Sequence, residues 1–267
     1  MLLNVIREYC RVMKKLEVFT VFLLTLLAGC KKEGSETDQS RARVKESKFY
    51  YFDGTYYQQY YQYNQAGQLI RDEDRRDDGA LMSFREYHYT ASLLNSVNLH
   101  SAHARVAETK YIYEGQKLRR QEYFEVKETG IEKVFEQVYD YDEDVLRKIT
   151  CNYFNHVPSY YITFEYDGKN ISRQKTFRIP ENTLKEDAVF EYDDKINPFY
   201  GLMPVSGNAR YNSFNNLVKV STSFLPEGSV QEINIRYEYQ NGLPVKQFNV
   251  LSDGTRLHEQ TYIYEDL

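Results

Sequence analysis

The sequence predicts an all-β protein, an antiparallel meander of about sixteen strands that coils into a wide barrel or a curled single sheet. Three observations support this fold class. An aromatic-x-aromatic triplet recurs about every 25 residues, turn signals recur between the triplets, and the segments between turns alternate apolar with polar residues. A fixed period of this length is typical of repeat architectures.

The triplet closes one strand of each repeat. Its second aromatic residue returns at intervals of 19 to 28 residues. The copies are Tyr61-Gln62-Tyr63, Tyr87-His88-Tyr89, Tyr111-Ile112-Tyr113, Tyr139-Asp140-Tyr141, Phe164-Glu165-Tyr166, Phe190-Glu191-Tyr192, a degenerate copy at Tyr211, Tyr237-Glu238-Tyr239 and Tyr262-Ile263-Tyr264. Before Tyr239, Ile233, Ile235 and Tyr237 alternate with polar residues, which is the period of a half-buried strand.

Each repeat also carries two turn signals. Glycine supplies the positive φ that tight hairpin turns require, and two such turns per repeat leave two segments of roughly eight to ten residues. One signal follows the triplet, at Ala66-Gly67, Glu114-Gly115, Asp167-Gly168, Asn215-Asn216 and Asn241-Gly242, and the other lies at Asp53-Gly54, Asp78-Gly79, Thr129-Gly130, Glu227-Gly228 and Asp253-Gly254. Each repeat is therefore a pair of antiparallel strands, and residues 48–267 form a single β-repeat domain.

Residues 1–29 are predicted to be a signal peptide. Two lysines precede Leu16–Leu27, a stretch of twelve residues that contains three polar members. A membrane-spanning helix needs about twenty apolar residues, so this stretch is too short to cross a bilayer. Charged residues before Met13 are unusual in a leader, which makes Met13 an alternative translation start.

The leader ends in Leu27-Ala28-Gly29-Cys30, which resembles the lipobox of bacterial lipoproteins. The resemblance implies cleavage before Cys30, diacylation of that cysteine and attachment to membrane lipid. It implies an outer-membrane lipoprotein of the cell envelope, on the cell surface or the periplasmic face. The alternative is an ordinary signal peptide with a coincidental Cys30. Residues 30–47, nearly all polar after the cysteine, are predicted to be a disordered tether.

The repeat unit, a triplet followed by a glycine turn, an aliphatic-base strand and a second turn, resembles the YD repeats of Rhs-type proteins. Together with the lipobox, it also resembles a family of bacterial lipoproteins of unknown function that have a porin-like fold. The unit YDDKxNPF of that family stands here as Tyr192-Asp193-Asp194-Lys195-Ile196-Asn197-Pro198-Phe199. The resemblance implies an architecture and a location, and no activity.

The charge pattern argues against a pore that spans a membrane. A spanning strand presents lipid a face free of charge, because Lys or Arg near the midplane costs about 2–4 kcal/mol. In residues 118–126, Arg120 and Glu122 lie on one face while Arg119 and Glu125 lie on the other. Since several strands have charges on both faces, we expect most of the chain not to span.

Several other classes of function are disfavoured. The formal net charge is −5 and no basic stripe occurs, so nucleic acid is not expected as a partner. His100 and His103 lack a helical or HExxH context, and no phosphate-binding or dinucleotide glycine pattern occurs, so no metal, cofactor or catalytic residue is predicted. The run Arg71–Asp78 is interpreted as a solvated, self-neutralising hairpin tip. Cys151 is interpreted as a small buried strand residue.

The function predicted is a non-enzymatic, lipid-anchored envelope module that acts as a scaffold or binds a ligand, with an envelope polysaccharide or an outer-membrane protein as partner. Tyrosine rings stack on sugars, which favours a glycan. The candidate binding residues are Tyr56 and Tyr60, on the face of their strand opposite Tyr61 and Tyr63, where they are covered by another element or exposed to a partner, and Phe199 and Tyr200, in the irregular stretch 194–210. That stretch is alternatively a corner or plug that closes the sheet. The alternative functions are a glycan-active enzyme and a structural component of an outer-membrane complex.

Overall fold

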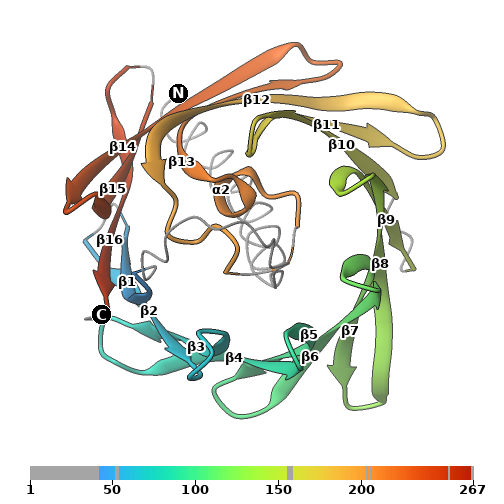
Figure 1. The fold of residues 1–267 in the computed structure, drawn as a ribbon, viewed down its shortest axis with the longest axis horizontal. Coiled ribbons are helices and arrows are strands. Elements are labelled where there is room, and N and C mark those ends of the chain that lie inside the picture. Colours follow the sequence, from blue (N-terminus) through green and yellow to red (C-terminus); the bar gives the residue numbers. More distant parts are fainter. Residues whose placement is uncertain are drawn as a thin grey trace, which may run out of the picture.

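The fold is a closed barrel of antiparallel strands (Figure 1). The computed structural model describes residues 42–51, 54–154, 159–202, 204, 206–251 and 253–265. The strands are β1 (Val44–Tyr50), β2 (Tyr56–Tyr63), β3 (Leu69–Arg76), β4 (Leu81–Thr90), β5 (Leu93–Ser101), β6 (Arg105–Glu114), β7 (Lys117–Lys127), β8 (Gly130–Asp142), β9 (Val145–Tyr153), β10 (Tyr160–Asp167), β11 (Asn170–Arg178), β12 (Thr183–Ile196), β13 (Asn215–Phe224), β14 (Ser229–Gln240), β15 (Leu243–Val250) and β16 (Arg256–Tyr264). Each strand pairs with its neighbours in sequence, and β1 pairs with β16. The predicted number of strands and their meander order are confirmed. The sequence predicted either a wide barrel or a curled single sheet, and the structure has the barrel.

The barrel has two unlike rims. The triplets end at one of them, which we call the triplet rim; the described chain enters there at Val44 and leaves at Tyr264, which are paired. The other rim, which we call the far rim, carries turns such as the one that joins β3 to β4 at Gly79. Between β12 and β13 the chain turns inward from the triplet rim and forms the short helix α2 (Ala209–Asn212) inside the ring (Figure 1). No helix in the described ranges is long and apolar enough to cross a membrane.

A β-bulge recurs at the same place in the repeat. The triplets lie at the ends of the even-numbered strands. At the second aromatic residue of a triplet, the pairing of that strand with the following odd-numbered strand shifts by one residue. The shift occurs in eight pairs of strands, at Tyr63, Tyr89, Tyr113, Tyr141, Tyr166, Tyr192, Tyr239 and, where β16 pairs with β1, Tyr264. In the strand that follows, the first inward side chain is the aliphatic residue and the next is three positions later, as in Leu118 and Gln121, both buried. The bulge thus changes which residues of every odd strand face the interior.

The first strand begins earlier than the sequence indicated. Strand β1 starts at Val44, so residues 44–47 belong to the barrel and not to the tether predicted for residues 30–47. Val44 and Ser47 are buried, while Lys45 is exposed and Glu46 is half-buried. The charged residues that face outward gave this stretch the composition of a tether. Its inward residues, Val44 and Ser47, nevertheless belong to the strand that closes the barrel. The predicted signal peptide, Cys30 and the first part of the predicted tether lie outside the described residues.

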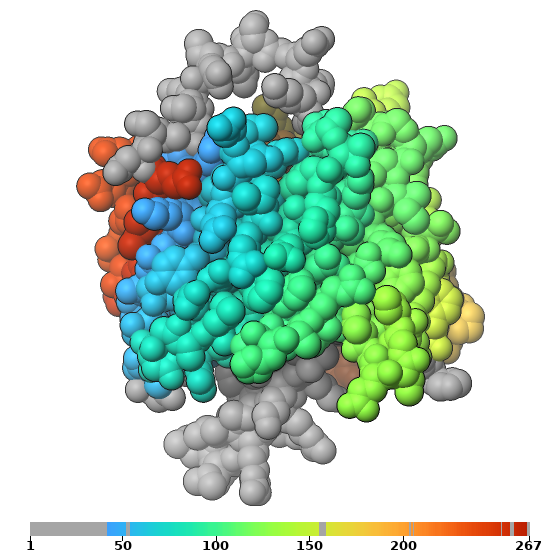
Figure 2. Space-filling view, turned by 90° about the horizontal axis from the view of Figure 1, so that it is seen from below, coloured from blue at the N-terminus to red at the C-terminus, as the bar shows by residue number. Residues whose placement is uncertain are grey.

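The outer wall of the barrel is polar. Figure 2 shows the strands from β1 to β9 side by side as a continuous, inclined wall. Ion pairs cross this wall between neighbouring strands; they include Arg71–Glu86, Lys133–Glu122, Arg173–Asp187, Lys219–Glu232 and Lys246–Glu259. Aromatic rings on the same wall lie under cations, as Phe84 does with the Arg71 guanidinium carbon 3.8 Å from its ring centre. Charged groups of both signs therefore cover the face that a membrane barrel presents to lipid.

The Arg173–Asp187 pair gives a pH-dependent prediction. Two hydrogen bonds from Arg173, of 2.7 and 2.6 Å, lower the pKa of Asp187 below its usual value of 3.8. A lowered pKa contributes stability above the unfolded-state pKa, and that contribution disappears as pH falls through the folded-state pKa. The variant Arg173→Gln is expected to raise the Asp187 pKa toward 3.8, measured by NMR titration of the carboxyl carbon. An unchanged titration would show that the two hydrogen bonds do not form in solution.

Candidate functional site: the barrel interior

The interior is lined by the aromatic residues of the triplets. The first aromatic of six triplets is buried: Tyr61, Tyr87, Tyr111, Tyr139, Phe164 and Tyr262. Burial raises the pKa of each of the five tyrosines, because a phenolate would lose its hydration inside the barrel. The tyrosine rings stay neutral, and together with Phe164 they form an apolar layer in which each tyrosine keeps one polar end.

The second tyrosine of several triplets ties neighbouring strands together at the triplet rim. The Tyr63 hydroxyl donates to the Val44 carbonyl at 2.8 Å, that of Tyr89 to the Leu69 carbonyl at 2.9 Å, and that of Tyr264 to the Pro244 carbonyl at 2.7 Å. A hydrogen bond of this kind contributes about 1 kcal/mol. The recurrence of the triplet therefore has a structural cause, since its hydroxyls bind backbone groups at the bulges.

Side-chain amides form a second interior layer next to the rings. The Tyr139 hydroxyl lies 3.1 Å from Gln121 Oε1 and 2.9 Å from Gln137 Oε1, so that its one proton is shared between two acceptors, and the Tyr61 hydroxyl donates to Gln59 at 2.7 Å. All three glutamines are buried. The interior thus presents rings, hydroxyls and amides rather than a purely apolar surface.

A buried ionic cluster interrupts these neutral layers in β3 and β4. Arg85 Nε donates to Asp72 Oδ1 at 2.7 Å, and the Tyr87 hydroxyl donates to Asp72 Oδ2 at 2.5 Å. The Asp72 and Arg85 side chains are 1% and 3% exposed. Burial raises the pKa of Asp72, and Arg85 and Tyr87 offset only part of that increase. The prediction that Arg71–Asp78 is a solvated hairpin tip is wrong for Asp72, because the bulge after Tyr63 turns this side chain inward.

A pocket of about 200 Å³ adjoins the cluster at the end of β3 to β6 nearest the far rim. Its lining residues are Asp74, Met82, Ser83, Arg85, Leu99, His100, Ser101 and Val106. Further bulges at Arg75 and His100 leave Met82 and Val106 without a ladder partner. Bulges of this kind redirect side chains and are common beside functional sites. The pocket therefore combines two charged side chains with an apolar side.

The interior also holds the plug, which we define as the described residues between β12 and β13, namely 197–202, 204 and 206–214. Asn197 Nδ2 donates to the carbonyls of Arg210 at 2.7 Å and Ser213 at 3.0 Å, which closes the base of the plug. The Phe199 ring contacts those of Tyr61, Tyr211 and Tyr262, at centroid distances of 6.4, 5.5 and 6.0 Å. The plug alternative for this stretch therefore agrees with the structure.

Arg210 ties the plug to β15 and β16. Its Nη2 donates to Gln247 at 2.9 Å, Gln260 at 2.7 Å and the Tyr262 hydroxyl at 3.3 Å. The cavity left between the plug and the wall is about 10 Å³, which is room for about one water molecule. The plug thus packs closely against this side of the barrel.

The structure separates the four candidate binding residues. Tyr56 lies on the outer wall, where Lys48 covers its ring at 5.3 Å and Tyr50 packs beside it at 5.5 Å. Tyr60 pairs with Glu46 and Glu73 on the neighbouring strands and is half-buried. They do not form one open aromatic face, because a cation already occupies the ring of Tyr56.

The two candidates in the plug have packing roles. Phe199 packs between three tyrosines, as described above, and the Tyr200 ring meets Phe214 edge to face at 5.3 Å. Sequence reasoning did not identify Asp72, Asp74 or Arg85 as interior residues. The recurrent bulge is the signal that would have placed Asp72 and Asp74 there, because it shifts the inward positions of β3 by one residue. Arg85 needs no bulge, because simple alternation puts it on the same face of β4 as Tyr87.

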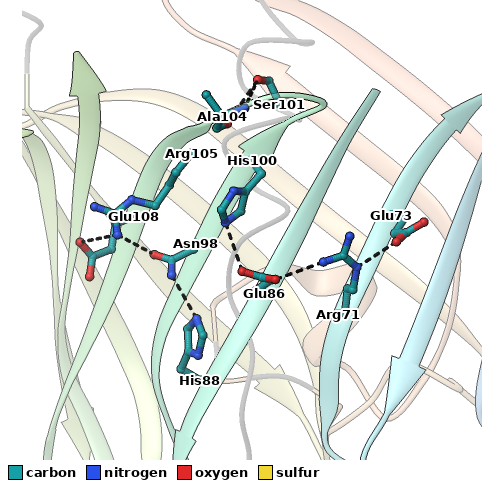
Figure 3. Close-up of polar contacts among 10 residues, drawn as sticks. All are labelled: Arg71, Glu73, Glu86, His88, Asn98, His100, Ser101, Ala104, Arg105 and Glu108. Atoms are coloured by element: carbon teal, nitrogen blue, oxygen red, sulfur yellow. Dashed lines mark hydrogen bonds and ion pairs between the residues drawn. The ribbon is translucent and has the colours of Figure 1, made fainter. Parts of the chain in front are cut away.

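Two histidines, His88 and His100, lie in networks of polar contacts on the outer wall (Figure 3). His100 Nε2 is 3.2 Å from Glu86, whose other carboxylate oxygen accepts from Arg71 at 3.1 Å. His88 shares a 3.1 Å contact with Asn98. In the described ranges no three His, Cys, Asp or Glu side chains gather in a metal-binding arrangement. His100 is thus held by its contact with Glu86 and by stacking on Phe84 at 4.4 Å.

Cys151 is buried in β9, and burial raises its pKa to about 11. Only the thiolate alkylates, so at pH 8 we expect iodoacetamide to modify Cys151 at least about 100-fold more slowly in the folded chain than in urea. Mass spectrometry of the Cys151 peptide measures both rates without interference from the other cysteines. Equal rates would show that the thiol is accessible in the native barrel.

Comparison with family models and with curated proteins gives no match. Two solved structures resemble the chain over most of its length. A porin-like protein from Bacteroides vulgatus ATCC 8482 aligns with a TM-score of 0.59 at 10% identity, over 85% of this chain and 100% of that one. A porin-like protein from Bacteroides uniformis ATCC 8492 aligns with a TM-score of 0.54 at 12% identity, over 83% and 98%.

A partial match to the TcdB2-TccC3-Cdc42 structure covers 79% of this chain and 14% of that one, with a TM-score of 0.23 that supports no argument about fold. At identities of 10% and 12% the two Bacteroides structures show the fold alone. The porin-like architecture expected from the sequence is confirmed, whereas membership of the lipoprotein family stays a prediction. The chain therefore has a porin-like β-barrel fold.

Proposed function

We propose that this protein is a lipid-anchored envelope barrel whose outer wall faces water and whose interior binds a glycan. The observation that carries the proposal is the distribution of charge. Ion pairs cover the outer wall, where a membrane barrel has an apolar band about 25 Å tall. Rings, hydroxyls and amides line the inside instead. A wall of this kind favours anchoring through a lipid on Cys30 over insertion of the strands.

The anchoring part is tested by replacing Cys30 with serine in the full chain. The acylated wild type is expected to stay in the membrane fraction after an alkaline wash, because two acyl chains give stable binding. The Cys30→Ser chain is expected to leave it. Retention after the wash of Cys30→Ser protein from which the leader has been removed, as judged by its mass, would show that the strands themselves hold the protein in the bilayer, and would overturn the proposal.

The binding part rests on the chemistry of the interior. Aromatic rings stack on the C–H faces of sugars, and amides, hydroxyls and carboxylates bind their hydroxyl groups. Small-ligand sites combine an apolar lining with a few convergent polar groups in this way. Outer-wall rings such as Tyr56 and Phe84 are already covered by cations, so the proposed site lies inside.

Pull-down with immobilised envelope polysaccharides tests the glycan. Binding is expected to decrease when Arg85 or Asp74 is replaced and to persist when the outer-wall residue Tyr56 becomes alanine. No binding to any polysaccharide would reject the glycan proposal. Turnover of a bound polysaccharide would replace it with an enzymatic role, and co-purification of a membrane partner in the absence of glycan would indicate an assembly role.

A further inference from the structure

The pocket beside the ionic cluster is the part of the interior that is built most like a ligand site. Figure 1 shows β3 to β6 on the side of the ring opposite α2, so the helix of the plug does not cover this wall. The volume of the pocket, about 200 Å³, is smaller than the roughly 300–1,000 Å³ of sites that bind drug-sized ligands. The pocket therefore fits one ring-sized unit of a ligand.

The polar side of the pocket is held rigidly. Asp72 accepts a hydrogen bond from Arg85 on one carboxylate oxygen and from Tyr87 on the other, so the Asp72 carboxylate and the Arg85 guanidinium are both fixed. Asp74 is held in turn by Ser83, which donates to Oδ2 at 2.9 Å, and by Arg85 Nη2, which donates to the same oxygen at 3.4 Å. A site whose groups are fixed before binding loses less entropy when the ligand arrives.

One oxygen of Asp74 remains for a ligand. Both hydrogen bonds that the Asp74 carboxylate accepts from described residues fall on Oδ2, which leaves Oδ1 for a donor in the pocket. The Asp74 side chain is 21% exposed, in contrast to the enclosed Asp72. Asp74 is thus the charged group of the cluster that a ligand can reach.

The charge of the cluster selects the ligand. Two carboxylates, Asp72 and Asp74, face a single guanidinium, that of Arg85, which leaves one negative charge in excess. A partly buried negative charge favours a cationic donor and disfavours an anion. On the other side, Met82, Leu99 and Val106 offer an apolar surface to the face of a ring.

We propose that this pocket binds an amine-bearing sugar unit, with its ammonium group donating to Asp74 Oδ1 and its ring lying against Met82, Leu99 and Val106. The inference rests on the glycan binding proposed above and names the class of sugar. Neutral sugars bind more weakly because they lack the charge, and uronic acids are rejected because Asp72 and Asp74 repel a carboxylate.

Calorimetry on the full-length, detergent-solubilised protein tests this with three probes: a glucosamine hexamer, its N-acetylated counterpart and an oligogalacturonate. The glucosamine hexamer is expected to bind at least about tenfold more tightly than the acetylated one, with no detectable binding of the oligogalacturonate. Asp74→Asn is expected to abolish the preference for the amine. Asp187→Asn, which changes an outer-wall carboxylate, is expected to preserve it.

A second variant separates binding from folding. Met82→Trp fills the pocket from a half-exposed bulged position without touching the ionic cluster, and is expected to weaken glucosamine binding at least about tenfold. Equal binding of the two hexamers, or a preference that survives Asp74→Asn, would overturn this inference while leaving glycan binding intact. Absence of binding by every glycan would instead reject the proposed function.

Discussion

Replacing Arg85 with methionine is expected to lower the free energy of unfolding by about 3–5 kcal/mol, because it leaves Asp72 as a buried carboxylate without its cation. Asp72 is 1% exposed, so water cannot replace the guanidinium. The Tyr87 hydroxyl still donates to it, but a neutral donor stabilises a carboxylate less than a guanidinium does. Urea unfolding followed by circular dichroism measures the change.

Two further variants isolate the role of burial. Arg173→Met removes the same kind of cation from an outer-wall aspartate, where the Arg173 side chain is 40% exposed; it is expected to cost about 1 kcal/mol or less. The double variant Asp72→Asn and Arg85→Met is expected to recover much of the loss, since no unpaired charge is left. Equal costs for Arg85→Met and Arg173→Met would show that the Asp72 site is open to water.

The cost of Arg85→Met is also expected to depend on pH. Burial already raises the pKa of Asp72 above its usual value of 3.8, and loss of Arg85 raises it further. A carboxyl group with a raised folded-state pKa lowers the free energy of unfolding as the pH rises from its unfolded-state pKa to its folded-state pKa. The variant should therefore regain stability when the pH is lowered from neutral toward 4, and a cost that is independent of pH would contradict this account.

The number and order of the strands could be predicted because the repeat records them locally. Each repeat contains two turns, and each turn needs its own residues, as Gly79 and Gly242 show with φ of +81° and +79°. Closure could not be predicted, because it depends on the pairing of β1 with β16, which are about 200 residues apart in the chain. The start of β1 was hidden by its charged outward residues.

The candidate site was less predictable than the fold, and the bulges are the reason. Simple alternation from Leu69 places Arg71 and Glu73 inside and Asp72 outside, which is the reverse of the structure. The same shift makes Gln121 an interior residue in β7. The position of the plug residues was also beyond local reasoning, since Phe199 finds its partners on β2 and β16.

Replacing Gly207 with alanine is expected to destabilise the docked plug by about 2–5 kcal/mol, because a strained backbone and overpacking act together at this position. Gly207 has a φ of +72°, and a Cβ there would lie 2.3 Å from Phe164 Cζ and 3.1 Å from Ile149 Cδ1. Both neighbours are buried core residues, so neither ring nor methyl group has room to retreat. Urea unfolding gives the total cost.

Gly228→Ala is the matched control for that change. Gly228 has nearly the same φ, +70°, but a Cβ there would meet nothing within 4 Å. It therefore carries the backbone strain alone, about 1–2 kcal/mol, and the difference between the two variants measures the close approach of the plug to Phe164. If the plug leaves the barrel instead of straining it, limited proteolysis should cut residues 197–214 in Gly207→Ala and not in Gly228→Ala. Equal stability and equal protection of the two variants would show that the plug does not dock against β9 and β10 in solution.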